Sequence, residues 1–207
     1  VSGLALYGDV QAHVQSGQFI PQLRLFSGKV FEDGHNNQTT FVEKAVEEAV
    51  KTLREQYGCK VFNLSYGDAN KVYDGRHVRG LAYTLDRLTR ELGVLFVVPT
   101  GNLQPSELPA NPRNDYPGYL LDDSARLLDP ATALNALTVG GLTRHTATRD
   151  TQRHLNTIED LPVAQVADLP FPLTRSGFSI GGAIKPDLVE HAGNLAVART
   201  GGRARHA

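Results

Sequence analysis

The sequence predicts an α/β fold: a three-layer, doubly wound, mostly parallel sheet with helices on both faces. The first observation is the run VLFVV at residues 94–98, because five consecutive apolar residues are typical of a strand buried on both faces. The second is a pair of amphipathic patterns, at residues 42–57 and 78–92, each followed by a glycine. The third is their alternation with strand candidates, which favours right-handed crossovers between parallel strands.

Length and composition indicate one globular domain over residues 1–207. Hydrophobic residues make up 41% of the chain, charged residues 21%, and the formal net charge is -1. This near-neutral balance argues against a nucleic-acid or anionic-membrane partner. The one cysteine, Cys59, excludes an internal disulfide and a cysteine-based metal site. No cofactor and no metal are predicted, and without a targeting or membrane segment the cytoplasm is the first expectation for location.

The N-terminal third has one strong element and several weak ones. Residues 1–8 resemble part of a helix, and a polar loop is expected from there to Gly17. Residues 23–31 alternate imperfectly between apolar and polar and predict a strand, closed by a turn at residues 32–37. The sequence TFVE at residues 40–43 is a capping box, so a helix should follow it along residues 42–57 and stop at Gly58.

The central third alternates strand and helix. A strand is expected over residues 60–68, a helix over residues 78–92, and the apolar strand over residues 94–98. That last strand runs into a turn with the sequence TGN at residues 100–102, and ligands bind at the carboxyl ends of strands in open α/β sheets. The Asn102 amide is a neutral donor of the kind that oxyanion holes use. The alternative is that Gly101 and Asn102 are an ordinary turn pair.

The last third is less regular. Four prolines at positions 105, 109, 112 and 117 predict a long surface excursion, with one short helix near residues 122–128. A buried strand is expected at residues 136–141, a polar loop over 143–170, and two short strands around 171–179 and 184–189.

Several motifs, taken in order, resemble the middle of a subtilisin-like serine peptidase of the subtilase family. NLSYG at residues 63–67 resembles the family's N-x-S-x-G substrate-binding strand, and TGN at 100–102 resembles its oxyanion turn. Residues 129–140 are similar to the segment that begins at a substrate-pocket proline. KPDLV at 185–189 matches the K-P-D-[IL]-V signature, and VSG at 1–3 resembles the end of the helix that carries the catalytic His. Each motif is weak alone, but their order makes the set specific.

The resemblance implies a subtilisin-like fold and a role for each matching residue. The Asn102 side-chain amide would be one oxyanion donor. Glu32, Asp33 and Gly34 would flank the other side of an extended peptide. Substrate binding is assigned to six further residues: Ser65, Tyr66, Gly67, Thr100, Gly101 and Pro130. The implied partner is a peptide or protein substrate.

The departures from the family pattern concern catalysis. The family's Asp and His would precede Val1, and no G-T-S nucleophile motif occurs in residues 1–207. The chain contains no Met. We therefore expect a truncated, central fragment of a subtilisin-like endopeptidase that is inactive alone. Its remaining partners would be the missing N- and C-terminal parts of the same peptidase domain.

Two other functions remain open at this point. The sequence GFSIG at residues 177–181 matches the G-x-S-x-G nucleophile elbow, which would make Ser179 the nucleophile of an α/β-hydrolase-type esterase. Pro186 argues against the helix that an elbow needs after its Ser. The third possibility is a non-catalytic peptide-binding module, a pseudoprotease that keeps the peptide-binding strands but lacks catalysis.

Overall fold

The computed structural model describes residues 2–30, 41–146, 160–198 and 205–206. The chain divides into two compact units, residues 1–60 and residues 61–207, which are described separately. The expectation of one domain over the whole chain stays a prediction. Among the described residues, no helix combines the length and the apolar character that a membrane crossing requires.

The described residues of the first unit form three helices, α1 (Ser2–Tyr7), α2 (Val10–Ser16) and α3 (Val42–Tyr57). Helix α1 confirms the helix expected at the start of the chain. Helix α2 occupies the segment predicted to be a polar loop, so that prediction is wrong. The Asp9 carboxylate accepts a hydrogen bond from the Ala12 backbone N–H at 3.1 Å, and Gly17 ends the helix with φ at 66°. These two caps are a local signal for a helix that lacks a strong apolar stripe.

The strand predicted over residues 23–31 is wrong for its described part. Residues 23–30 form no strand, and Leu23 and Leu25 are 50% and 44% exposed. Alternating apolar residues form a strand only when a neighbouring strand completes the hydrogen bonds and a core covers one face. Phe31 and the turn predicted at residues 32–37, with Glu32, Asp33 and Gly34, lie outside the described residues.

Helix α3 confirms the amphipathic pattern that predicted it. Val46 and Val50 are buried, and Gly58 ends the helix with φ at 71° and an N–H that donates to the Arg54 carbonyl at 3.1 Å. The N-cap is Phe41, whose side chain makes no cap hydrogen bond, and Thr40, on which the predicted capping box depends, lies outside the described residues. Packing of the apolar face and the Gly58 cap both stabilise this helix.

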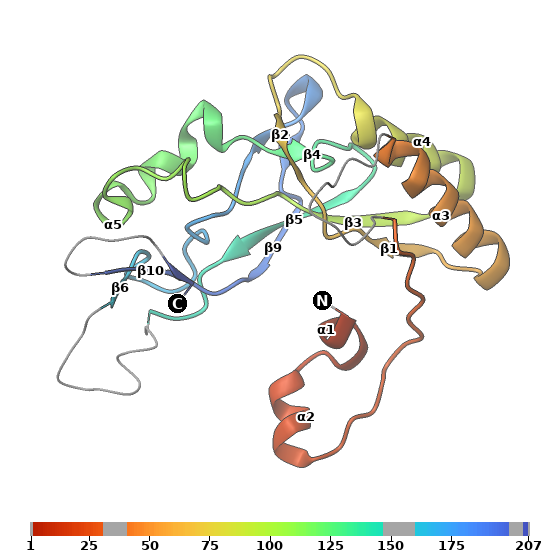
Figure 1. Ribbon diagram of the computed structural model, residues 1–207, viewed down its shortest axis with the longest axis horizontal. Helices are drawn as coiled ribbons and strands as arrows, with labels where there is room; N and C mark the ends of the chain where they lie inside the picture. Colours follow the sequence, from red (N-terminus) through yellow and green to blue (C-terminus); the bar gives the residue numbers. More distant parts are fainter. Residues whose placement is uncertain (1, 31–40, 147–159, 199–204, 207) are drawn as a thin grey trace. The chain divides into compact units, whose positions relative to one another are not determined.

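The second unit is built on a four-stranded sheet of order β1-β3-β5-β9, and every neighbouring pair is parallel. Figure 1 shows the four strands, β1 (Val61–Asn63), β3 (Leu95–Pro99), β5 (Leu137–Leu142) and β9 (Leu188–His191). The parallel α/β class is confirmed. In β3, Phe96 and Val98 are each 1% exposed but Leu95 is 41% exposed, so burial is complete on one face of this strand only.

Helix α4 (Gly80–Leu92) connects to β3 and begins two residues later than its pattern predicts. Leu81, Leu85 and Leu88 are buried, and Gly93 ends the helix with φ at 59°. The N-terminal N–H groups are satisfied by a distant residue. Two carboxylate oxygens of Asp129 accept from the backbone N–H groups of residues 81 and 82 at 3.1 and 2.8 Å. An anionic side chain at this end of a helix also favours the helix dipole.

The segment predicted as one strand over residues 60–68 contains two strands. Strand β1 ends at Asn63, and β2 (Asp68–Val72) pairs antiparallel with β4 (Leu128–Asp129). Between them the Asn63 amide donates to the Ser65 hydroxyl at 2.9 Å, and the Tyr66 N–H donates to the Leu64 carbonyl at 2.9 Å. Beyond Leu64 these local hydrogen bonds take the place of sheet pairing, so residues 64–67 form a connection between two sheets.

The excursion, residues 103–128, is more regular than its prolines predict. It contains α5 (Pro112–Asp115) and two 3-10 turns, η1 (Gly118–Leu121) and η2 (Asp123–Ala125). The short helix predicted near residues 122–128 is present in part, as the 3-10 turn η2, whereas α5 and η1 were not predicted. A proline is tolerated in the first turn of a helix, where its missing N–H costs nothing, and Pro112 starts α5.

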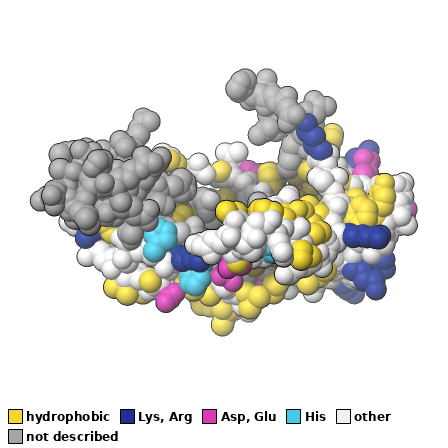
Figure 2. Space-filling model, turned by 90° about the horizontal axis from the view of Figure 1, so that it is seen from below, with side chains coloured by type: hydrophobic (Ala, Val, Ile, Leu, Met, Phe, Trp, Pro, Cys, Tyr) yellow, Lys and Arg dark blue, Asp and Glu magenta, His cyan; other side chains and the backbone are white. Residues whose placement is uncertain are grey.

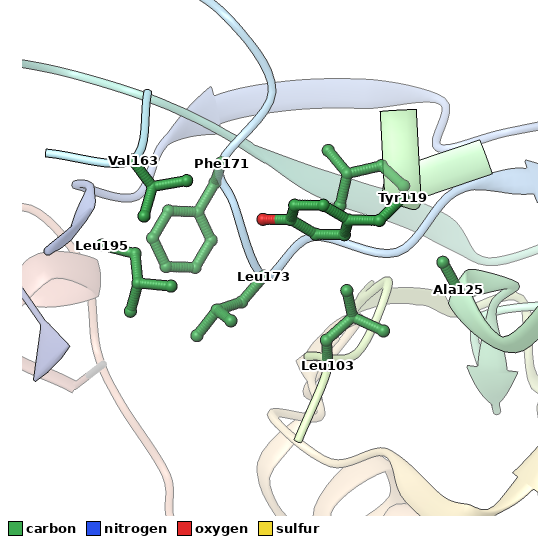
Figure 3. Packing of buried hydrophobic residues seen from close by; sticks show 8 residues of the cluster. Leu103, Tyr119, Ala125, Val163, Phe171, Leu173 and Leu195 are labelled. Atoms are coloured by element: carbon green, nitrogen blue, oxygen red, sulfur yellow. The ribbon is translucent and has the colours of Figure 1, made fainter. Parts of the chain in front are cut away.

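The excursion is packed against later segments through a hydrophobic cluster of its own. Its buried members are Leu103, Tyr119, Leu120, Ala125, Val163, Phe171, Leu173 and Leu195. In Figure 3 the Phe171 ring lies between the side chains of Val163 and Leu195 on one side and Leu173 and Tyr119 on the other. The Tyr119 hydroxyl donates to the Pro172 carbonyl at 2.7 Å. Burial raises the pKa of Tyr119 well above its ordinary value.

The remaining strands are short. Strands β6 (Asp160–Pro162), β10 (Leu195–Ala198) and β11 (Arg205–His206) form an antiparallel sheet of order β11-β10-β6, and β7 (Gly177–Phe178) pairs with β8 (Ile184–Lys185) around the turn η3 (Ile180–Gly182). The strand predicted around residues 171–179 is reduced to β7, and the one over 184–189 divides at Pro186. Hydrophobic side chains of this region stay exposed, including Ile184 at 75% and Leu188 at 54%. Figure 2 shows hydrophobic side chains at the surface among charged ones.

Candidate active site

Two of the predicted site segments follow neighbouring strands of the sheet. Strands β1 and β3 are parallel partners, so their carboxyl ends lie at the same edge. Residues 64–67 continue from β1, and residues 100–102 continue from β3. The Leu64 N–H donates to the Val97 carbonyl at 3.0 Å, which extends the pairing past the end of β1. This edge is where ligands bind in open α/β sheets.

A close contact between two glycines brings these segments together. A Cβ atom placed on Gly67 would lie 3.6 Å from the Gly101 Cα and 3.3 Å from the Leu128 Cδ1. A Cβ on Gly101 would lie 2.6 Å from the same Leu128 atom, and Gly101 has φ at +91°. Two features therefore require glycine at position 101: its backbone conformation has a positive φ, and the Leu128 side chain leaves no room for a Cβ atom. The result is that residues 65–67 and 100–102 lie side by side.

Thr100 forms the buried base of the turn. It is 3% exposed, its N–H donates to the Val139 carbonyl of β5 at 3.1 Å, and its carbonyl accepts from the Leu128 N–H at 3.3 Å. Its hydroxyl is 3.2 Å from the Thr174 hydroxyl. These contacts fix the start of the turn to three parts of the structure: strand β5 of the sheet, strand β4, and Thr174, which directly follows Leu173 of the hydrophobic cluster.

Asn102 is exposed, and the contacts that hold it involve its backbone. Its carbonyl accepts from the Arg175 Nε at 3.1 Å, and Asn102 forms an isolated antiparallel bridge with Thr174. The next residue, Leu103, donates its N–H to the Leu173 carbonyl at 2.9 Å. The amide side chain is thus presented to solvent on a turn whose backbone is anchored, which is what a preorganised donor requires.

Pro130, like Thr100, is buried, whereas the other predicted substrate-binding residues are exposed or half-buried. It follows Asp129 through a cis peptide bond. A cavity of about 520 Å³ lies on the Asp129 side of β4, lined by Asn70, Lys71, Val72, Tyr73, Asp74, His77, Arg79, Gly80, Asp129 and Thr132. None of the seven predicted site residues lines it. The substrate-binding and catalytic roles of all seven residues stay predictions.

A family model described as the subtilase family matches residues 1–206 of this chain. The chain belongs to the subtilase family. The resemblance that the ordered motifs indicated is therefore confirmed, and the family is one of serine peptidases that act on proteins. No residue role follows from the family match alone.

Two individual proteins are similar to this subtilase. An uncharacterized protein, y4bN, of Sinorhizobium fredii (strain NBRC 101917 / NGR234) is 37% identical over 155 residues, which is 72% of this chain and 35% of that protein. The solved structure titled "Structure of Prenylagaramide maturation protease PagA" is 17% identical, with a TM-score of 0.40, over 86% of this chain and 46% of that one. The chain thus spans about a third to a half of the length of these proteins.

The position of Ser179 shows that the nucleophile-elbow interpretation of this subtilase is wrong. Ser179 is 3% exposed, and its hydroxyl donates to the Thr132 carbonyl at 2.6 Å. The two-residue strand β7 precedes it, and a single 3-10 turn follows it. An elbow needs a buried strand, an α-helix and an exposed hydroxyl. The hydroxyl of Ser179 instead satisfies a backbone carbonyl.

The K-P-D motif of the subtilase has a structural role here. Lys185 is 4% exposed, and its ammonium group donates to the Ala136 carbonyl at 2.8 Å and to the Asp187 carboxylate at 2.7 Å. The same Asp187 oxygen accepts the Thr138 N–H at 2.7 Å. The motif therefore joins the segment before β9 to the start of β5, and it keeps the parallel sheet in register.

Sequence reasoning missed three residues that build the site, namely Leu128, Thr174 and Arg175. Arg175 and its carboxylate partner Glu107 are 68 positions apart, so no spacing in the sequence connects them. Because Arg175 lies between two polar residues, Thr174 and Ser176, its sequence context predicts an ordinary solvent-exposed arginine. For the described residues, no group of three or more His, Cys, Asp or Glu side chains has an arrangement that could hold a metal ion.

Proposed function

We propose that this chain is a segment of a subtilisin-like serine endopeptidase in which the Asn102 side-chain amide donates a hydrogen bond to the oxyanion. The carrying observation is the contact between Gly67 and Gly101, which puts the candidate peptide-binding residues beside the turn that presents Asn102. A neutral donor on an anchored backbone stabilises charge as it develops and needs no reorganisation at that moment.

The proposed substrate is an extended stretch of polypeptide. Ser65, Tyr66 and Gly67 lie between β1 and β2, outside both strands, and Ser65 is exposed. In this proposal their backbone pairs with the peptide as an added strand, so main-chain hydrogen bonds supply most of the affinity. Thr100 and Gly101 lie beside these residues, and in this proposal they limit the space for the substrate residue whose peptide bond is cleaved. Pro130 has a supporting role under this surface.

Catalysis needs groups that residues 1–207 do not offer in the family's pattern. Acyl transfer requires a nucleophile and a base in addition to an oxyanion donor. In our proposal other parts of the same peptidase supply the Asp, the His and the nucleophilic Ser, together with a second oxyanion donor. The exposed apolar side chains of β8 and β9 are consistent with a further segment that covers them. The chain alone is then inactive.

The test compares the isolated chain with the complete protein in which this sequence occurs. We expect the complete protein to degrade casein and a fluorogenic peptide, and a fluorophosphonate that modifies nucleophilic serines to abolish the activity. The isolated chain should show no turnover above a mock preparation. Turnover by the isolated chain would contradict the proposal. A complete protein that binds peptides without cleaving them would instead indicate a pseudoprotease.

A further inference from the structure

We propose that Arg175 is a positioning residue for the Asn102 turn, residues 100–102, and that Glu107 fixes Arg175 in turn. The inference rests on the proposed function, since it concerns the geometry of the proposed oxyanion donor. It begins from burial. Arg175 is 0% exposed, although arginine side chains are almost never fully buried unless they are paired.

Every N–H of the Arg175 guanidinium group has an acceptor. Nε donates to the Asn102 carbonyl at 3.1 Å, and Nη1 donates to the carbonyls of Ser124 and Arg126 at 2.6 and 3.1 Å. Nη2 donates to both carboxylate oxygens of Glu107, at 2.7 and 2.6 Å. Because a guanidinium group has five N–H donors, the group is saturated. One rigid plane therefore joins the Asn102 turn to two parts of the excursion.

Glu107 supplies the charge that allows this burial. Its side chain is 24% exposed, and besides Arg175 it accepts the Gln104 N–H at 2.6 Å. A buried guanidinium without a counter-charge is strongly disfavoured, and an arginine held by a carboxylate keeps a defined orientation. Glu107 thus determines where the Nε–H of Arg175 points, and so where the Asn102 carbonyl lies.

The Asn102 turn depends on such contacts because packing does not hold its exposed end. Beyond Asn102 the chain leaves the sheet for the excursion, and its anchors there are the Arg175 bond, the bridge to Thr174 and the bond from Leu103 to Leu173. A displacement of about 1 Å at a catalytic group costs roughly 10²-fold in rate. A shift of the Asn102 carbonyl moves its amide by a similar amount.

The first experiment uses Arg175→Lys in the complete protein. Lysine keeps a positive charge near Glu107, but its donors share one nitrogen and do not reproduce the planar fork. We expect kcat per titrated active site to fall roughly 10- to 100-fold while KM changes by less than about 2-fold. The matched control is Arg126→Lys, since the Arg126 side chain lies in the same excursion, is 42% exposed and pairs with Asp123. The control should leave kcat and KM unchanged.

A double-mutant cycle with Asn102→Ala separates positioning from a general structural role. If Arg175 acts through Asn102, Arg175→Lys lowers kcat in the wild-type background and has less than about a 2-fold effect in the Asn102→Ala background. An equal loss in both backgrounds would overturn the inference. So would an unchanged kcat per active site with only a lower unfolding midpoint.

The same cycle distinguishes failure of this inference from failure of the proposed function. If Asn102→Ala leaves kcat unchanged, the proposed function fails. If Asn102→Ala lowers kcat and Arg175→Lys does not, only the inference fails. Should Arg175→Lys not fold, Glu107→Gln replaces it, because the amide keeps the shape and removes the charge. Glu107→Gln should then weaken binding of a peptide aldehyde, which mimics the oxyanion, far more than binding of the product peptide; equal weakening of both would reject the inference.

Discussion

The turn at residues 100–102 and the turn at residues 177–181 place similar polar residues in opposite environments. Both contain glycine with positive φ, Gly101 in the first and Gly177 and Gly181 in the second. Asn102 is exposed and is held through its backbone, whereas Ser179 is 3% exposed and its hydroxyl is bonded to the Thr132 carbonyl. What distinguishes a candidate catalytic group from a structural one is therefore which of its polar atoms the fold has already satisfied.

Replacing one glycine in each turn sharpens this comparison and should give the largest effect on stability. Gly101→Ala combines φ at +91° with a Cβ 2.6 Å from Leu128, whereas Gly177→Ala has φ at +131° and no atom within 4 Å. We expect Gly101→Ala to lower the free energy of unfolding by about 3–5 kcal/mol, from backbone strain plus overpacking, and Gly177→Ala by about 1–3 kcal/mol. Urea unfolding of both variants measures the difference. Equal losses would mean that Leu128 moves away freely.

Removing the Ser179 hydroxyl tests the buried side of the comparison. Ser179→Ala should lower the free energy of unfolding by about 1–3 kcal/mol, because the Thr132 carbonyl loses its buried donor. The activity of the complete protein per folded molecule should stay the same. A fluorophosphonate probe should leave Ser179 unlabelled, as judged by mass spectrometry of its peptide. Stoichiometric labelling of Ser179 would reverse the assignment of the two turns.

A smaller effect is expected from the cluster that supports the excursion. Tyr119→Phe removes the hydrogen bond to the Pro172 carbonyl and should cost about 1 kcal/mol. Burial raises the pKa of Tyr119 above its ordinary value of 10.0, so the folded state keeps the phenol neutral where the unfolded chain ionises it. Stability should fall as the pH rises above about 10, and the fall should be shallower in Tyr119→Phe. Identical pH dependence in both proteins would show that Tyr119 is not the group responsible.

The elements that sequence predicts well are those with a strong local signal. Helices α3 and α4 have an apolar stripe and a glycine stop, and β3 and β5 are short apolar runs, so each was found within about two residues. The failures depend on partners elsewhere in the chain. Residues 23–30 alternate between apolar and polar but form no strand. Residues 64–67 connect β1 of the parallel sheet to β2, which pairs instead with the distant strand β4.

The site follows the same rule. The NLSYG and TGN segments were found because their residues are contiguous, and the structure brings them together through Gly67 and Gly101. Their roles in substrate binding and oxyanion stabilisation stay predictions. Arg175 could not be found, because its acceptors come from four separate positions and its burial depends on an excursion whose path the sequence does not define.

The most direct test of the account is Asn102→Ala in the complete protein, with the unfolding midpoint and the single-turnover rate measured on the same sample. Since the Asn102 side chain is exposed and its anchors are backbone atoms, stability should change by less than about 0.5 kcal/mol. The rate should fall roughly 10²- to 10³-fold with little change in KM, a magnitude taken from the oxyanion-hole asparagine of subtilisin, whose role we propose for Asn102. A large loss of stability with an unchanged rate per folded molecule would contradict the account.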